Sequence, residues 1–160
     1  FPFAATLTTA EVYDAFLGPA DSARTFYHGH TYTANPLGCA VALAGLELFA
    51  DGTLLSHVAD RAAQLRAGVQ PLTALLHVGE ARTLGMVAAL ELVADQVTRA
   101  PIDPAIPRRI YQRGLREGLL LRPMGTVTYL FLPLCTTAEE LDDILGRFRA
   151  TLEAVLTRGE

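Results

Sequence analysis

The chain has 160 residues, of which 51% are hydrophobic and 19% charged, and its formal net charge is −4. This length can bury the core of one domain, or of one domain and part of another. The mildly acidic charge argues against nucleic acid as the main partner, and no apolar run reaches the length of a membrane span. We therefore expect a globular, cytoplasmic protein that binds neither nucleic acid nor a membrane.

The chain begins at Phe1 rather than at a methionine. It contains 13 arginines and no lysine. The first feature predicts that the chain is an internal or carboxy-terminal part of a longer protein. Cys39 and Cys135 lie far apart in the sequence and lack the spacing of metal ligands. We expect both cysteines to be buried, free thiols.

Local signals predict the elements of the first third of the chain. Residues 4–9 alternate and are rich in threonine, which predicts a strand, and a short helix capped by Thr9 follows. Asn35 and Pro36 predict the start of a longer helix, because asparagine caps free amides and proline suits the first turn. That helix continues to residue 50 and is almost entirely apolar or small, so we expect it to be buried on most sides.

Six further elements are predicted in the rest of the chain. In chain order they are a helix over 53–76, a strand over 82–93, a helix over 104–118, strands over 119–123 and 127–133, and a helix over 136–156. Gly85 indicates either a bulge or a close approach of another backbone, Gly118 ends a helix, and Thr137 and Glu140 form a capping box. The order of elements indicates an α+β unit, with residues 1–50 belonging to a preceding domain.

Residues 28–35 carry hydroxyl groups and histidines directly before the predicted long helix. Hydroxyls and free amides at a helix start can bind an anion such as a phosphate, with Thr31 as the first candidate. The alternative is that Thr31, Thr33 and Asn35 only cap the helix and turn the chain. His28 and His30 have the spacing of a metal-binding pair, but no third ligand is near in sequence, so we expect no metal site.

Arg122 follows three leucines and precedes a proline, at the end of a predicted apolar strand. An arginine in that place either holds a carboxylate through two parallel hydrogen bonds or is an exposed residue at a strand end. Tyr129, on the adjoining strand, either reaches the same cleft or packs within the sheet. The sequence contains no serine–histidine–acid motif, phosphate loop, dinucleotide fingerprint or zinc pattern.

Three stretches that contain these residues resemble the carboxy-terminal portion of the class III pyridoxal-phosphate aminotransferases. They are AATLTTAEVYDAFL, FYHGHTYTANPLGCAVALAGLELF and GLLLRPMGTVTYLFLPLCTTAEELD. The resemblance implies an α/β parent of fold type I, with residues 1–50 as the tail of the cofactor-binding large domain and 51–160 as an α+β small domain. Within the class, the stretches most resemble enzymes that convert 8-amino-7-oxononanoate to 7,8-diaminononanoate in biotin biosynthesis.

The resemblance also implies roles for five residues. The hydroxyl of Thr31 and the backbone of His30 would bind the phosphate of pyridoxal 5′-phosphate. For His30 only the main-chain role carries over, because the family often has proline at this position. Gly29 would lie against the substrate. Arg122 would hold the carboxylate of the keto-acid substrate, and Tyr129 would line the same site.

The resemblance implies a homodimer, because the threonine loop serves the active site of the neighbouring subunit. The family's Schiff-base lysine has no counterpart in this chain, so we expect the chain to be inactive alone. The amino donor, S-adenosylmethionine or another amine, is left open. Two alternatives remain, namely another class III ω-aminotransferase and a non-catalytic, truncated interaction module.

Overall fold

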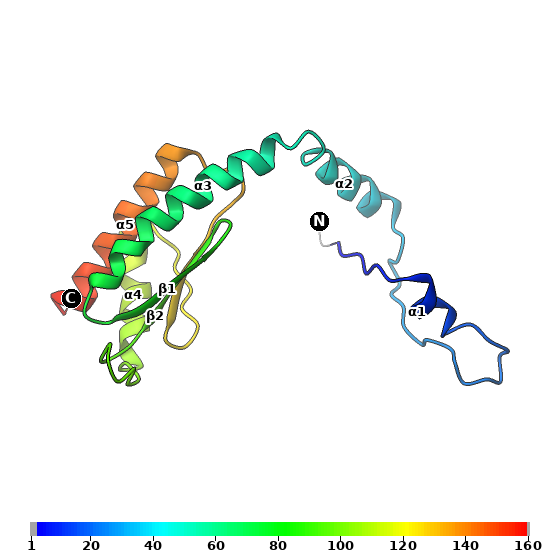
Figure 1. Cartoon of the computed structure of the whole chain (residues 1–160), viewed down its shortest axis with the longest axis horizontal. Coiled ribbons are helices and arrows are strands. Elements are labelled where there is room, and N and C mark those ends of the chain that lie inside the picture. The colour runs from blue at the N-terminus through cyan, green and yellow to red at the C-terminus, as the bar shows by residue number, and fades with distance from the viewer. Residues whose placement is uncertain (1–2, 160) are drawn as a thin grey trace. The chain divides into compact units, whose positions relative to one another are not determined.

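The structure is a computed structural model that describes residues 3–159. The chain divides into two compact units, Phe1–Asp51 and Gly52–Glu160. The first unit contains helices α1 (Ala10–Asp14) and α2 (Pro36–Glu47). The second contains the other helices and all the described strands; Figure 1 labels α3, α4, α5, β1 and β2 along its ribbon.

Both helices of the first unit begin where the sequence predicts. The amide of Val12 donates to the hydroxyl of Thr9 at 3.4 Å, so Thr9 caps α1. The side-chain oxygen of Asn35 accepts from the amides of Leu37 and Gly38 at 2.9 and 3.4 Å. These short-range hydrogen bonds confirm the two predicted helix starts, because a cap needs only residues within one turn.

Two expectations for the first unit are wrong. Residues 4–9 form no strand, and no described strand pairs with them; a strand is stable only when a neighbour takes its backbone hydrogen bonds. Helix α2 is exposed, and Gly38 is its only buried residue. Because the described part of the first unit is exposed almost throughout, it contains no core on which α2 could bury its apolar side chains.

The second unit begins with helix α3 (Thr53–Val69), which the 3₁₀ helix η1 (Gln70–Ala74) continues. Strands β1 (Val78–Leu84) and β2 (Val87–Leu92) then form an antiparallel hairpin. Helix α4 (Ala105–Arg116), strand β3 (Val127–Phe131) and helix α5 (Ala138–Thr157) complete the unit.

The hairpin corrects the prediction of one strand over 82–93. Gly85 lies at the turn between β1 and β2 with φ of +52°, a conformation that glycine adopts readily, so it turns the chain rather than forming a bulge. The irregularity in the ladder lies instead between Val78 and Glu80. Sequence periodicity could not separate these arrangements, because both leave apolar residues alternating along the chain.

The segment 119–123 also differs from the prediction, since it forms no strand. It leaves α4 at Gly118, which has φ of +77° and ends the helix as predicted. Leu121 is buried against Gly114, where a Cβ atom would come within 2.9 Å of the leucine side chain. The segment is therefore fixed by packing on the helix instead of by ladder hydrogen bonds.

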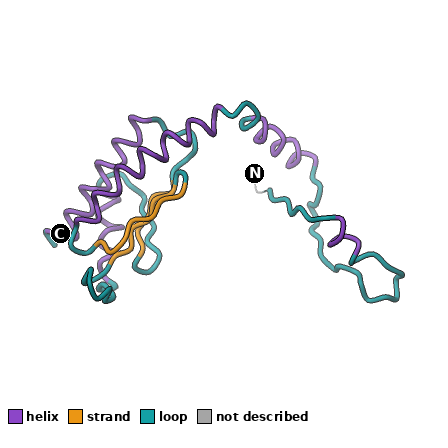
Figure 2. Tube along the Cα trace, viewed as in Figure 1, coloured by secondary structure: helices purple, strands orange, loops and turns teal. Residues whose placement is uncertain are grey.

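The three strands form an antiparallel sheet in the order β1-β2-β3, and the helices cover one of its faces (Figures 1 and 2). The core lies between this face and the helices. Its fully buried side chains include Leu65, Leu90, Ile110, Leu141, Phe148 and Leu152. Helix α5 starts at the predicted capping box, in which Thr137 and Glu140 exchange hydrogen bonds of 2.8 and 3.2 Å.

No described helix of the second unit covers the opposite face of the sheet. The register places Arg82, Ala89 and Tyr129 in one row across the three strands, and Leu84, Val87 and Phe131 in the next. Leu84 is 83% exposed and Phe131 76% exposed. Side chains alternate between the two faces of a strand, so both rows point away from the helices.

Cys39 is half-buried and Cys135 exposed, and both are free thiols. The expected burial is wrong, because α2 and the loop before α5 both lie at the surface. No helix among residues 3–159 is both long enough and apolar enough to cross a membrane.

Candidate active-site segments

Residues 31–34 form a turn directly before α2, and this turn carries the predicted phosphate-binding threonine. The hydroxyl of Thr31 is exposed and makes no hydrogen bond with any described residue. Thr33 instead closes the turn, because its hydroxyl accepts from the amide of His30 at 3.2 Å while its own amide donates to the carbonyl of His30 at 3.1 Å. The hydroxyl of Thr31 is thus available to a ligand, whereas the amide of His30 is already in use.

The amides at the start of α2 are also in use. Asn35 accepts from the amides of Leu37 and Gly38 through its side chain, and its carbonyl accepts from Cys39. An anion near this turn would therefore rely on side-chain donors such as Thr31, or would displace hydrogen bonds that the turn makes internally.

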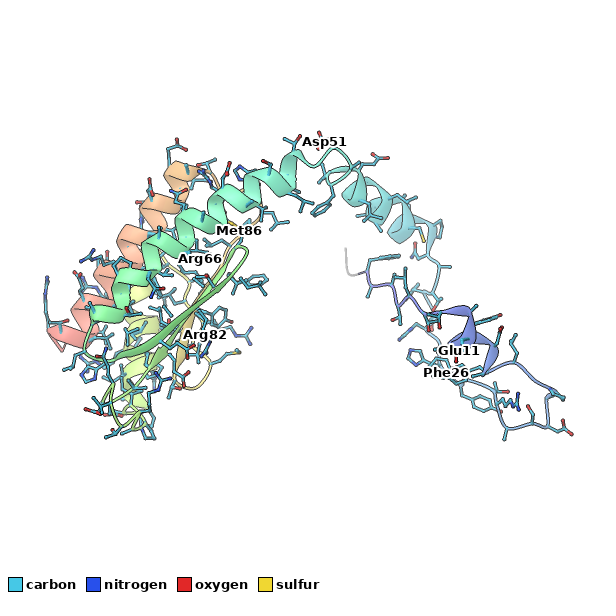
Figure 3. The ribbon with its side chains drawn as sticks, viewed as in Figure 1. Glu11, Phe26, Asp51, Arg66, Arg82 and Met86 are labelled. Carbon is cyan, nitrogen blue, oxygen red and sulfur yellow. The ribbon has the colours of Figure 1, made fainter. Side chains whose placement is uncertain are left out.

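His28 and His30 lie beside a hollow of about 740 Å³, together with Thr6 and Thr33. The two imidazole rings meet edge to face, with ring centroids 4.9 Å apart. Figure 3 labels Phe26, whose ring packs against His28 at a centroid distance of 5.3 Å. Hydroxyl and imidazole groups can both donate hydrogen bonds to phosphate oxygens, so the residues around this hollow fit a phosphate group.

Two further sequence predictions concern this segment. Gly29 is exposed, and a Cβ atom built on it would meet nothing within 4 Å, so the described chain itself does not require a glycine there. Among the described residues, no group of three or more histidine, cysteine, aspartate or glutamate side chains could hold a metal ion.

In the second unit, the structure brings Arg122 and Tyr129 together around one hollow of about 420 Å³. The hollow lies between the segment that follows α4, strand β3 and helix α5. Arg122 and Tyr129 carry its polar side chains, and the remaining lining consists of glycine, leucine, isoleucine and phenylalanine residues. This hollow suits a ligand that is anionic at one end and apolar elsewhere.

The guanidinium of Arg122 is exposed and forms no ion pair with the described residues. Arg82, on the open face of the sheet (labelled in Figure 3), differs in this respect. Its guanidinium donates to Glu91 at 3.1 Å and to Glu80 at 2.9 Å, and the hydrogen bond to Glu91 together with the charge of Glu80 raises the pKa of Arg82. Arg82 is thus neutralised within the protein, whereas the charge of Arg122 is available to a ligand.

Sequence reasoning named Thr33 only as a residue that caps or turns the chain, and it did not name Leu120 or Phe131 as site residues. Thr33 forms a ring of hydrogen bonds with His30, and threonines before helices commonly make such turns. Leu120 and Phe131 line the hollow that contains Arg122. Their positions two residues from Arg122 and Tyr129 were the available signal, since residues at this spacing share a side of an extended chain.

The family model for aminotransferase class-III matches residues 1–152. The chain belongs to the class-III aminotransferases. The expected fold class, a part of the α/β fold type I, is confirmed by this match and by the solved structures that resemble it.

One similar protein is the adenosylmethionine-8-amino-7-oxononanoate aminotransferase of Geobacter sulfurreducens. It is 44% identical over 156 residues, which are 96% of this chain and 34% of that protein. The chain thus spans about a third of the length of the curated relatives that it matches.

Two solved structures are similar as well. The adenosylmethionine-8-amino-7-oxononanoate aminotransferase of Methanocaldococcus jannaschii has a TM-score of 0.82 at 32% identity, over 91% of this chain and 34% of that one. A PLP-bound aminotransferase mutant from Vibrio fluvialis has a TM-score of 0.77 at 26% identity, over 84% of this chain and 30% of that one.

Proposed function

We propose that this chain is the carboxy-terminal part of a PLP-dependent aminotransferase that converts 8-amino-7-oxononanoate to 7,8-diaminononanoate in biotin biosynthesis. In this proposal residues 1–50 are the tail of the large domain and 51–160 the small domain of a cytoplasmic homodimer. The proposal draws on the family membership and on the relatives whose names carry this activity.

The observation that carries the proposal is the pairing of Arg122 with Tyr129 in an otherwise apolar hollow. The substrate named by the relatives has a carboxylate at one end of an unbranched chain and a ketone near the other. Arg122 would donate two parallel hydrogen bonds to the carboxylate, and the hydroxyl of Tyr129 would donate a third. These contacts fix one end of the substrate and so limit the positions of its ketone.

Thr31 would donate its free hydroxyl to a phosphate oxygen of PLP, with Gly29 beside the substrate. The backbone of His30 would contribute only if its amide gave up its hydrogen bond to the hydroxyl of Thr33 and donated to the phosphate instead. When bound, PLP supplies the carbonyl group that accepts the amine and a ring that withdraws electrons. The chain contains no lysine, so the amine that anchors this cofactor must come from residues outside these 160.

The test is turnover by the full-length protein that carries this chain. We expect conversion of 8-amino-7-oxononanoate with S-adenosylmethionine or another amine as donor. Mass spectrometry of the diamine product measures this conversion. Efficient turnover of ω-amines with pyruvate, and none of 8-amino-7-oxononanoate, would show that the substrate assignment is wrong.

That second outcome defines the alternative function, another class III ω-aminotransferase. It has one structural observation in its favour, because an arginine beside a tyrosine can bind the carboxylate of any keto acid. A full-length protein that binds no PLP would instead favour a non-catalytic interaction module.

A further inference from the structure

The Arg122 hollow has an apolar wall that the proposed function does not use. Leu120 and Phe131 both line the hollow and are 79% and 76% exposed. We propose that Leu120 and Phe131 determine substrate specificity by holding the methylene chain of the carboxylate that Arg122 binds. This inference rests on the proposed function and adds the residues that select for chain length.

The geometry follows from alternation along two segments. Leu121 is buried on the core side, so Leu120 and Arg122 on either side of it are exposed. On β3, Thr128 and Leu130 are buried towards the helices, so Tyr129 and Phe131 share the open face. Each segment therefore presents one polar group and one apolar group, two residues apart, to the same hollow.

This arrangement matches the chemistry of an unbranched aliphatic carboxylate. The carboxylate contacts Arg122 and Tyr129, while its methylene groups pack against Leu120 and Phe131 and are thereby removed from water. Each methylene that is fully buried strengthens binding by about fourfold. A short keto acid would gain only the ionic contact, so the apolar wall favours long substrates over short ones.

The experiment measures competitive inhibition of the full-length enzyme by acetate, pentanoate, heptanoate and nonanoate. The variants are Leu120→Ala, Phe131→Ala and Arg122→Lys. Leu84→Ala is the matched control, because Leu84 lies in the same cross-strand row as Phe131 and is at least as exposed, but does not line the hollow.

We expect the inhibition constant of the wild type to fall with each added methylene. In Phe131→Ala and Leu120→Ala, the fall per methylene should shrink to below about twofold, with acetate inhibition unchanged. Leu84→Ala should keep the wild-type dependence on chain length. A wild type without such a dependence, or alanine variants that retain it, would overturn the inference.

The outcomes separate this inference from the proposed function. Arg122→Lys should raise the inhibition constants of all four acids by a similar factor, because it removes the shared carboxylate contact. If Arg122→Lys has this effect while the alanine variants keep the chain-length dependence, only the apolar wall is refuted. If those variants also lower the unfolding temperature, Leu120 and Phe131 pack against protein rather than substrate.

Discussion

Arg122 is distinguished from Arg82 by the absence of a carboxylate partner among the described residues. An ion pair inside the protein would have to be broken before a ligand could bind. Arg122 avoids that cost, and the neighbouring Tyr129 hydroxyl likewise makes no hydrogen bond with the described residues. The two groups are therefore ready to receive a carboxylate.

If Arg122 binds the substrate carboxylate, replacing it should weaken substrate binding without affecting the cofactor. In the full-length enzyme, Arg122→Ala should raise KM for 8-amino-7-oxononanoate by about 10–100-fold, as expected for lost hydrogen bonds to a charged group. Arg122→Lys should not restore binding, because an ammonium lacks the planar fork. Steady-state kinetics and the cofactor absorption spectrum measure the two effects. Unchanged kinetics with lower thermal stability would make Arg122 an ordinary surface residue.

Thr31 is the free hydroxyl of the turn before α2, and its replacement should weaken cofactor retention. Thr31→Ala loses one hydrogen bond to a charged phosphate oxygen, worth about 1.5–3 kcal/mol, whereas Thr31→Ser keeps the hydroxyl. The dissociation constant of PLP in the full-length protein, measured by dialysis and absorbance, should rise only in the alanine variant. An unchanged constant would leave Thr31 as a residue that turns the chain.

At the scale of single elements, strand β3 and helix α5 each bury a threonine in the core. Thr128 and Thr151 are both fully buried, yet their hydroxyls differ. The hydroxyl of Thr151 donates to the carbonyl of Arg147 at 2.9 Å, whereas that of Thr128 has no hydrogen-bond partner among residues 3–159. A buried hydroxyl without a partner destabilises the folded state.

These two threonines give a matched pair of valine substitutions. Thr128→Val should raise the free energy of unfolding by about 1 kcal/mol, because it removes an unsatisfied polar group at nearly constant volume. Thr151→Val should lower stability or leave it unchanged, since it removes a hydrogen bond that is made. Thermal or urea unfolding measures both. Destabilisation by Thr128→Val would indicate that its hydroxyl has a partner, such as a buried water.

Gln96 and Asp95 are among the side chains that hold the loop between β2 and α4. Gln96 donates to the carbonyls of Thr73, Leu75 and Val78 at 2.8–3.1 Å, which ties the loop to the start of the sheet. Asp95 accepts from the amide and the hydroxyl of Thr98, and these bonds hold the pKa of Asp95 below its ordinary value of 3.8.

A lowered carboxyl pKa makes this loop sensitive to acid. The hydrogen bonds stabilise the loop above the pKa of the unfolded aspartate and are lost as pH falls through the lower, folded value. Amide exchange at residues 97 and 98 should therefore be protected near neutral pH, and protection should fall below pH 4. Asp95→Asn should lose much of the protection at neutral pH. Equal protection in both proteins across this range would contradict the role of the carboxylate.

At the scale of the whole molecule, the two units differ in how they bury apolar side chains. The second unit has a continuous core between the sheet and its helices. In the first unit, large apolar residues of α2 such as Leu37, Leu43 and Leu46 are more than half exposed. A helix that is apolar all round is usually buried on several sides, so α2 has the composition of a helix that packs against further protein.

The isolated 160-residue chain should consequently self-associate. Exposed apolar surface on this scale favours association in water, so sedimentation at tens of micromolar should show species larger than a monomer. A variant with Leu43→Glu and Leu46→Glu should associate less, because it places charges on α2. A clean monomer that binds little hydrophobic dye would contradict this expectation.

Features that depend on residues within one turn of each other could be predicted from the sequence alone. Asn35, Thr9 and the Thr137–Glu140 pair predicted three helix starts, and Gly118 predicted a helix end, because caps and left-handed residues act locally. The resemblance of three sequence stretches to class III aminotransferases also indicated the family, which the match over residues 1–152 confirms.

Which segments pair and which side chains meet became visible only in the folded structure. It made Gly85 the turn of a hairpin, left 119–123 without a ladder, and left α2 exposed. It also placed Arg122 and Tyr129 around one hollow with Leu120 and Phe131. These outcomes depend on the summed burial of many side chains across the core, which no local pattern encodes, even where the residues that meet are only a few positions apart.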